Sequence, residues 1–297
     1  MEKGLLEFIK KIRKHMCKNK ITMDDYFDAW LDQREKEGML KIKTLENYTR
    51  QIKRHLAPVF GAVPVKDVTT TMIQQFITTL EVEKGLSVMT IRNILGRLAT
   101  VMQKAVQEGL ITVNPCEGMI FPKGKQRKGQ AMTHIEQQRL EKCIDKETCV
   151  KDLAIKLALY SGMRVSEITA LRWQDIDFVN GFIHVYHSFQ RIKIDNKGSS
   201  KTMLFFGVPK SEKSIRNIPM NDILLDSLKK YYEQLPAIQK RDEAFVIGKK
   251  DGSYYDVRAL QRHFKQKIKA AAIPDYHFHD LRHTFATNAK ESGVDIQ

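Results

Sequence analysis

Apolar residues recur at three- and four-residue intervals through the first third of the chain, which is typical of amphipathic helices. One helix is expected from about Thr44 to Leu56. A second is expected to open at Thr71, because Thr71 and Gln74 have the spacing of a capping box. A third is expected from Val88 to about Gln107, with an inward apolar stripe. Together these stripes predict a small helical bundle over residues 21–121.

The second half of the chain mixes two periodicities. Thr133 and Glu136 form another capping-box pair at the start of a helix. Residues 177–185 contain an Asn-Gly dipeptide between β-rich flanks, which predicts a tight hairpin. Two further runs, 203–208 and 215–220, have the composition of strands, and the sequence then returns to helical patterns. The expected fold class is therefore mainly α with a small antiparallel β-sheet, an α+β protein.

The length of 297 residues exceeds what one hydrophobic core usually occupies, so we expect two compact domains. A segment rich in Pro, Gly and basic residues separates them and disfavours regular structure. The expected division is a basic N-terminal arm at 1–20, a helical domain at 21–121, a basic linker at 122–130, and a second domain at 131–297.

Charge gives the first indication of a partner. Fifty Lys and Arg residues against 35 Asp and Glu residues give a net charge of +15, which favours a polyanion such as nucleic acid over the alternative of a merely basic protein. No apolar run could span a bilayer and no secretory signal begins the chain, so a cytoplasmic protein without a membrane role is expected. The basic residues expected to contact DNA are Lys43, Arg50, Lys53, Arg54, Arg92, Lys123, Lys125, Arg127, Lys128, Lys213 and Arg216.

Three separated motifs carry candidate chemistry. Residues 159–168 read LYSGMRVSEI, in which Gly162 suits a helix end and Arg164 follows near the start of the next helix, where a phosphate would be favoured. Lys210 is expected at the tip of a β-hairpin. Residues 277–283 read HFHDLRH, so His279 and Arg282 share one helical face.

Each motif also has a simpler interpretation. An Arg after a Gly is commonly a surface residue, and a single Lys carries little information. His279 and His283 have the i, i+4 spacing of metal ligands, although that reading needs further ligands and Arg282 would repel the cation. We therefore expect no metal. The four cysteines match no metal or redox pattern and are interpreted as free thiols.

Together, the Arg box, the hairpin Lys, the HDLRHT box and the LRWQDID stretch after the Arg box resemble the tyrosine site-specific recombinases. The resemblance covers about residues 20–297, and the chain is similar to integrases of phages and conjugative transposons. It implies a core-binding domain followed by a catalytic domain. The partner would be double-stranded DNA at core-type attachment sites, with assembly into tetramers on paired sites and no cofactor.

The resemblance also implies roles for individual residues. Arg164, His279 and Arg282 would bind the scissile phosphate, and Lys210 would protonate the leaving 5′-oxygen. Glu167 would support the fold or orient a neighbour. In the family a tyrosine then attacks the phosphorus and forms a covalent link, which preserves the phosphodiester energy without ATP or metal.

This sequence departs from the family in one respect. None of its nine tyrosines follows Arg282, so no nucleophile is assigned, and the chain as given is expected to bind DNA without cleaving it. The same absence would weaken tetramer assembly, because the C-terminal segment that links protomers is also missing. Two alternatives remain open: a DNA-binding regulator that occupies attachment sites without chemistry, and a type IB topoisomerase-like enzyme.

Overall fold

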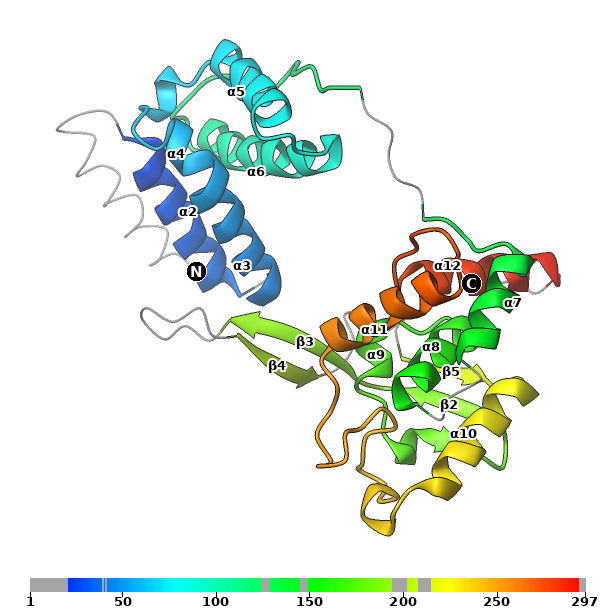
Figure 1. Ribbon diagram of the computed structural model, residues 1–297. Helices are drawn as coiled ribbons and strands as arrows, with labels where there is room; N and C mark the ends of the chain where they lie inside the picture. The colour runs from blue at the N-terminus through cyan, green and yellow to red at the C-terminus, as the bar shows by residue number, and fades with distance from the viewer. Residues whose placement is uncertain are drawn as a thin grey trace. The chain divides into compact units, whose positions relative to one another are not determined.

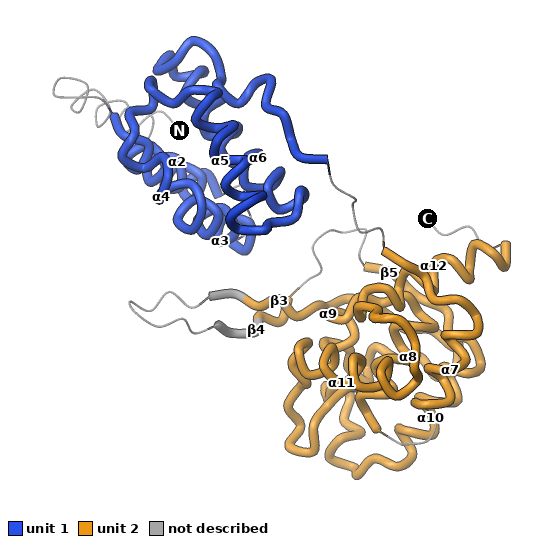
Figure 2. Tube along the Cα trace, turned by 45° about the horizontal axis from the view of Figure 1, so that its top comes forward, with its two compact units in different colours: residues 1–127 blue, residues 128–297 orange. Residues whose placement is uncertain are grey.

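The computed structural model describes residues 21–38, 40, 42–123, 129–144, 149–193, 202–207 and 215–293. The chain forms two compact units, residues 1–127 and 128–297 (Figure 2). The division falls inside the segment that the sequence predicts to be a linker. The predicted arm at 1–20 lies outside the described residues.

The described part of the first unit is entirely helical (Figure 1). Its elements are α2 (Met23–Glu37), α3 (Ile42–Gln51), the π-helical turn η1 (Ile52–Leu56), α4 (Ala57–Phe60), the 3₁₀ turn η2 (Val65–Asp67), α5 (Thr70–Val82) and α6 (Val88–Gln107). The predicted bounds of α6 are confirmed. The helix predicted over residues 44–56 begins two residues earlier and continues into α4, because the backbone stays right-handed helical through the π turn.

The core of the first unit consists of the predicted apolar stripes together with aromatic side chains from α2 and α4. Ile73, Ile77 and Leu80 of α5 are at most 2% exposed, and Trp30 of α2 is equally buried. The phenyl ring of Phe60 meets that of Phe76 edge-on, with centroids 5.2 Å apart. The stripes are therefore core, as their spacing predicts.

The start of α5 differs from the sequence prediction. Its N-cap is Thr69, whose hydroxyl accepts a hydrogen bond from the amide of Met72 at 3.3 Å. Gln74 makes no capping box with Thr71. Its amide group instead exchanges two hydrogen bonds with the backbone of Ile120, at 3.1 and 3.2 Å. The side chain of Gln74, which local spacing assigns to the helix end, thus bonds to Ile120, 46 residues away.

The second unit combines helices with short strands. Its elements are α7 (His134–Ile144), α8 (Val150–Ser161), α9 (Val165–Ile168), η3 (Trp173–Asp175), β1 (Ile176–Asp177), β2 (Phe182–Val185), β3 (Ser188–Lys193), β4 (Thr202–Gly207), β5 (Arg216–Pro219), α10 (Asp222–Gln234), η5 (Ala237–Gln239), α11 (Val257–Ala270) and α12 (Asp280–Glu291). The predicted capping box opens α7, where Glu136 accepts from the amide of Thr133 at 2.7 Å.

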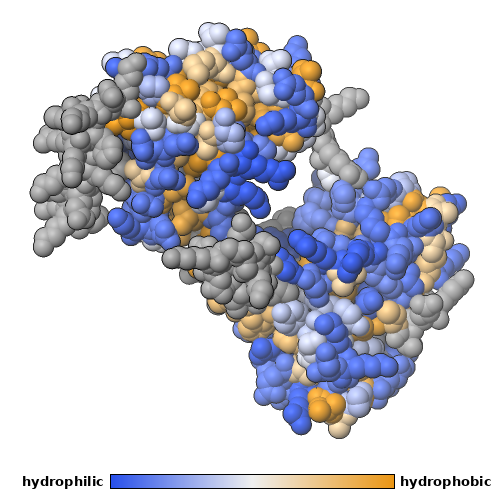
Figure 3. All heavy atoms as spheres, turned by 60° about the vertical axis from the view of Figure 1, so that its left-hand side comes forward, coloured by the Kyte–Doolittle hydropathy of each residue, from blue (hydrophilic) through white to orange (hydrophobic). Residues whose placement is uncertain are grey.

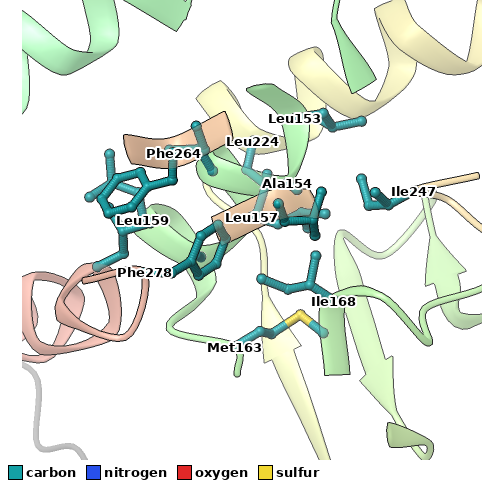
Figure 4. Close-up of a cluster of buried hydrophobic side chains, with 14 of the residues drawn as sticks. Leu153, Ala154, Leu157, Leu159, Met163, Ile168, Leu224, Ile247, Phe264 and Phe278 are labelled. Carbon is teal, nitrogen blue, oxygen red and sulfur yellow. The ribbon is translucent and has the colours of Figure 1, made fainter. Parts of the chain in front are cut away.

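Helix α8 is the centre of the second unit and packs against α9, α10, α11 and α12. Figure 4 shows its Leu153 and Leu157 among side chains from the surrounding elements, including Leu224 of α10 and Phe264 of α11. All four are at most 6% exposed. This core fixes the ends of α8 and α12, which carry the candidate site.

The strands form two antiparallel sheets, ordered β1-β2-β5 and β3-β4. The Asn-Gly hairpin is confirmed between β1 and β2, with Gly181 at φ +72°. The expected hairpin around Lys210 is wrong in its pairing, because β4 pairs with β3 and β5 pairs with β2. The strands on either side of Lys210 in the sequence therefore belong to different sheets, and Lys210 itself lies outside the described residues. The fold class, mainly helical with little antiparallel sheet, is confirmed.

The face shown in Figure 3 is mostly hydrophilic, with apolar side chains scattered in small groups. Within the described residues, no helix is both long and apolar enough to cross a membrane.

Candidate active site

Arg164 is placed by the junction between α8 and α9. Gly162 ends α8 in the left-handed conformation with φ +62°, as its position in the sequence predicts. The chain then turns so that Arg164 becomes the N-cap of α9. Its backbone amide and its guanidinium Nη1 both donate to the carboxylate of Glu167, each at 2.9 Å. Since α9 has only four residues, the positive character here comes from side chains and not from a helix dipole.

A second guanidinium reaches the same carboxylate from β5. Arg216 donates from Nη2 to Oε2 of Glu167 at 2.9 Å and from Nη1 to Oε1 at 3.3 Å. The carboxylate is only 2% exposed. Burial alone would raise the pKa of Glu167, but the hydrogen bonds from Arg216 and Arg164 outweigh it and bring the pKa below its ordinary value. Glu167 is therefore ionised at neutral pH and orients Arg164, as the sequence predicts.

Arg282 comes from the first turn of α12 and is anchored on α8, because its Nη1 donates to the carbonyl oxygen of Gly162. Burial, followed by the charges of Arg164 and Arg216, lowers the pKa of Arg282. The contacts of Arg164 and Arg216 with Glu167 and of Arg282 with Gly162, together with this effect on Arg282, place three guanidiniums in one electrostatic neighbourhood. The carbonyl of Gly162 is neutral, so the charge of Arg282 remains uncompensated by that contact.

His279 is the N-cap residue of α12, and its imidazole lies beside that of His283, with perpendicular rings 5.1 Å apart. Burial lowers the pKa of His279, and the charges of His283, Arg282 and Arg164 lower it further. The imidazole is therefore neutral at neutral pH and offers one N–H as a hydrogen-bond donor. Three of the four residues predicted to be catalytic thus come together; the fourth, Lys210, lies outside the described residues.

This arrangement suits an anion with several oxygens. Arg164 and Arg282 present planar donor groups that can each bind two oxygens of one phosphate, and His279 adds a neutral donor. Donors fixed before the ligand arrives stabilise the charge that develops on nonbridging oxygens during displacement at phosphorus.

The residues predicted to contact DNA are placed unevenly. Those that the structure describes in the first unit are exposed and accessible to a ligand. Arg216 differs, because its guanidinium is only 25% exposed and is engaged with Glu167. The exposed set is Lys43, Arg50, Lys53, Arg54, Arg92 and Lys123, whereas Lys125, Arg127, Lys128 and Lys213 lie outside the described residues.

Comparison with known proteins gives the family. Residues 130–297 match the phage integrase family, and residues 22–80 match the phage integrase N-terminal SAM-like domain. The chain belongs to the phage integrase family. It is thereby a member of the tyrosine recombinases, as the motifs predict.

Individual members of the family match over most of their length. A tyrosine recombinase XerC-like protein of Caldanaerobacter subterraneus subsp. tengcongensis is 27% identical over 93% of this chain and 74% of its own. The Tn1549 transposon integrase, solved with transposon right-end DNA, has the same fold with a TM-score of 0.76 and 22% identity, over 93% of this chain and 88% of its own. A lambda integrase tetramer on a Holliday junction has a TM-score of 0.68 and 21% identity, over 93% and 75% of the two chains.

Sequence reasoning missed a basic groove of this integrase chain. It runs along α11 to the start of α12 and is lined by Arg258, Arg262, Lys265, His277 and His279, among others. The first three residues recur at four- and three-residue intervals, so they follow one face of α11. The basic residues on this face of α11 are the feature of the sequence from which the groove could have been predicted. The groove includes His279 of the candidate site, and its lining also contains Asp256, while Lys265 is paired with Asp275.

Among the described residues, a separate cluster of Cys149, Asp152 and His263 has ligand atoms within 4.8 Å of one another. Asp152 is already engaged, because His263 hydrogen-bonds it at 2.7 Å and the ammonium of Lys267 lies 3.0 Å from its other oxygen. A cation there would have to compete with Lys267. We interpret the cluster as a buried ion network that joins α8 to α11.

Proposed function

We propose that this protein carries out site-specific recombination of double-stranded DNA, by cutting and rejoining strands at attachment sites. The observation that carries the proposal is the convergence of Arg164, His279 and Arg282 from the starts of α9 and α12, where Arg282 bonds to the carbonyl of Gly162, two residues before Arg164. A backbone phosphate is the ligand that two guanidiniums and a neutral imidazole fit best.

In the proposed reaction a tyrosine hydroxyl attacks the scissile phosphorus. A phosphotyrosyl bond to the 3′ side forms as the bond from phosphorus to the 5′-oxygen breaks, and Lys210 gives that oxygen its proton. Arg164 and Arg282 stabilise the negative charge on the nonbridging oxygens, more strongly in the transition state than in the ground state. The reverse reaction, with a 5′-hydroxyl from another strand, reseals the DNA.

We propose further that the attacking tyrosine is not among residues 1–297, so that this chain alone binds DNA without cleaving it. The tyrosines near the site support this. Tyr276 is 5% exposed and its hydroxyl donates to Glu136 at 2.9 Å. Burial and the carboxylate of Glu136 raise the pKa of Tyr276 to about 12, which disfavours the phenolate. The hydroxyl of Tyr160 donates to Glu141.

A suicide substrate tests the cleavage claim. Such a duplex carries a nick near the cutting site, so that a short fragment diffuses away and any covalent complex accumulates. The 297-residue chain should shift the duplex in a native gel and leave no adduct in a denaturing gel. A tyrosine-linked adduct would contradict the assignment of no nucleophile.

The phosphate site itself is tested by replacing its arginines. Arg164→Ala and Arg282→Ala should each weaken binding to a duplex selected from a random pool by about tenfold, as expected for a charged hydrogen bond of roughly 1.5 kcal/mol. Arg241→Ala is a matched control, since this exposed arginine follows η5 and belongs neither to the Arg164 cluster nor to the groove along α11. Equal affinity of all three variants and the unaltered chain would reject the site.

We also propose that copies of the chain assemble on paired DNA sites, as the lambda integrase tetramer does on a Holliday junction.

Binding should weaken steeply with salt, because exposed Lys and Arg side chains displace counterions from the phosphates. A flat salt titration would contradict this mode of binding.

A further inference from the structure

The ion cluster around Glu167 raises a problem of charge. Glu167 holds Arg164 in place through the backbone amide and the guanidinium. A single Arg–Glu pair, however, has no net charge to offer a phosphate. The carboxylate that orients Arg164 would thus cancel much of its attraction for DNA.

We propose that Arg216 is a positioning residue that cancels the charge of Glu167, so that Arg164 stays oriented and its own positive charge remains available to a ligand. The inference rests on the proposed function. It gives Arg216, which the sequence predicts to contact DNA, a role within the protein. With both arginines bound to one carboxylate, the three groups sum to +1, from two guanidiniums and one carboxylate.

The geometry assigns different tasks to the two arginines. Both bind the same two carboxylate oxygens, but Arg216 is 25% exposed and Arg164 is 46% exposed. Arg216 therefore lies nearer the buried side of the carboxylate, and Arg164 is more accessible to a ligand. A carboxylate that is 2% exposed is screened little by water, so its charge has to be balanced by protein groups.

The position of Arg216 is fixed by its strand. Arg216 pairs with Val185 across the β2–β5 ladder, so its backbone belongs to a sheet and not to a loop. Its charge also reaches beyond Glu167, because Arg216 and Arg164 both lower the pKa of Arg282. Removing Arg216 would therefore lower the positive potential at Arg164 and at Arg282 together.

Charge-restoring variants test this role. We would measure the affinity of the full chain for a duplex selected from a random pool, at one salt concentration. Arg216→Ala should bind about tenfold more weakly, as for loss of one partly screened charge. Adding Glu167→Gln to Arg216→Ala removes the unbalanced carboxylate and should return affinity to within about threefold of the unaltered chain. Arg216→Lys keeps the charge but loses the two-point contact with Glu167, so its affinity should lie between those of Arg216→Ala and the unaltered chain.

The outcomes separate the inference from the proposed function. If Arg164→Ala weakens binding and Arg216→Ala does not, or if Glu167→Gln fails to rescue Arg216→Ala, the balancing role of Arg216 is overturned and the phosphate site stands. If Arg164→Ala itself has no effect on DNA affinity, the proposed phosphate site is rejected, and the proposed function with it. Circular dichroism and the thermal midpoint of each variant monitor folding. Should Arg216→Ala not fold, Arg216→Gln loses the same charge, keeps a donor for Glu167, and has the same expected results.

Discussion

Gly162 joins the fold to the candidate site, and replacing it by alanine should disturb both. It ends α8 at φ +62°, and its carbonyl oxygen accepts from Arg282. A Cβ at this position would lie 2.4 Å from Cδ1 of Phe285, where ordinary contact begins at 3.4 Å. The half-buried phenyl ring of Phe285 would therefore have to move by about 1 Å.

The expected cost of Gly162→Ala has two parts. Left-handed backbone at a non-glycine residue costs roughly 1–2 kcal/mol. Overpacking against a neighbouring side chain typically adds about 1–3 kcal/mol. We therefore expect the free energy of unfolding of the second unit to fall by about 2–5 kcal/mol. Because the carbonyl oxygen of residue 162 accepts from Arg282, strain at residue 162 should weaken this contact, and DNA affinity should fall as well.

Gly181 provides a matched control. It also has a positive φ, +72°, but an added Cβ would meet no atom within 4 Å. Gly181→Ala should therefore show the backbone cost alone. Urea unfolding followed by the fluorescence of Trp173, in a Trp30→Phe background, reports the second unit separately from the first. Equal destabilisation by the two alanines would refute the claim that Phe285 confines Gly162.

Three further predictions follow from particular contacts. Glu167→Gln should destabilise the protein most near pH 7 and progressively less below about pH 4.5. The folded-state pKa of Glu167 lies below 4.5, and the stabilisation from the ionised carboxylate is lost as that carboxylate protonates. A pH series of urea melts measures this. Asp152→Asn should lower stability by roughly 3 kcal/mol, since it leaves Lys267 with its charge mostly buried, and Lys267→Met in the same background should recover part of the loss in thermal melts. Thr69→Ala should cost about 1 kcal/mol by loss of the N-cap of α5, whereas Thr71→Ala should be close to neutral, and equal effects would contradict the observed cap.

Local pattern predicted those features that depend on near neighbours. The α6 helix, the Thr133 capping box and the Asn-Gly hairpin all follow from residues within a few positions of each other, and the structure has each of them. The start of α5 was mispredicted because Gln74 bonds to Ile120, a partner that no local window contains. The hairpin at Lys210 was mispredicted for the same reason, since strand partners are chosen by the whole sheet.

The candidate site was predictable only as far as its motifs are linear. The Arg box and the HDLRH box identified Arg164, His279 and Arg282 as candidates, but no sequence pattern shows that Arg282 is anchored on Gly162. The role of Arg216 was also hidden. Its bond to Glu167 spans 49 residues and depends on β5 lying beside β2, so the sequence could suggest only a basic surface residue.

The central claim is that Arg164, His279 and Arg282 hold one backbone phosphate of duplex DNA. A methylphosphonate scan tests it directly, because each substitution removes the charge of a single phosphate. We predict that a methylphosphonate at one position weakens binding of the unaltered chain by about tenfold, and that the penalty at that position, unlike penalties at other contacted phosphates, disappears in Arg164→Ala and in Arg282→Ala. If the two variants retain the full penalty at every position, the three side chains do not share a phosphate and the account is wrong.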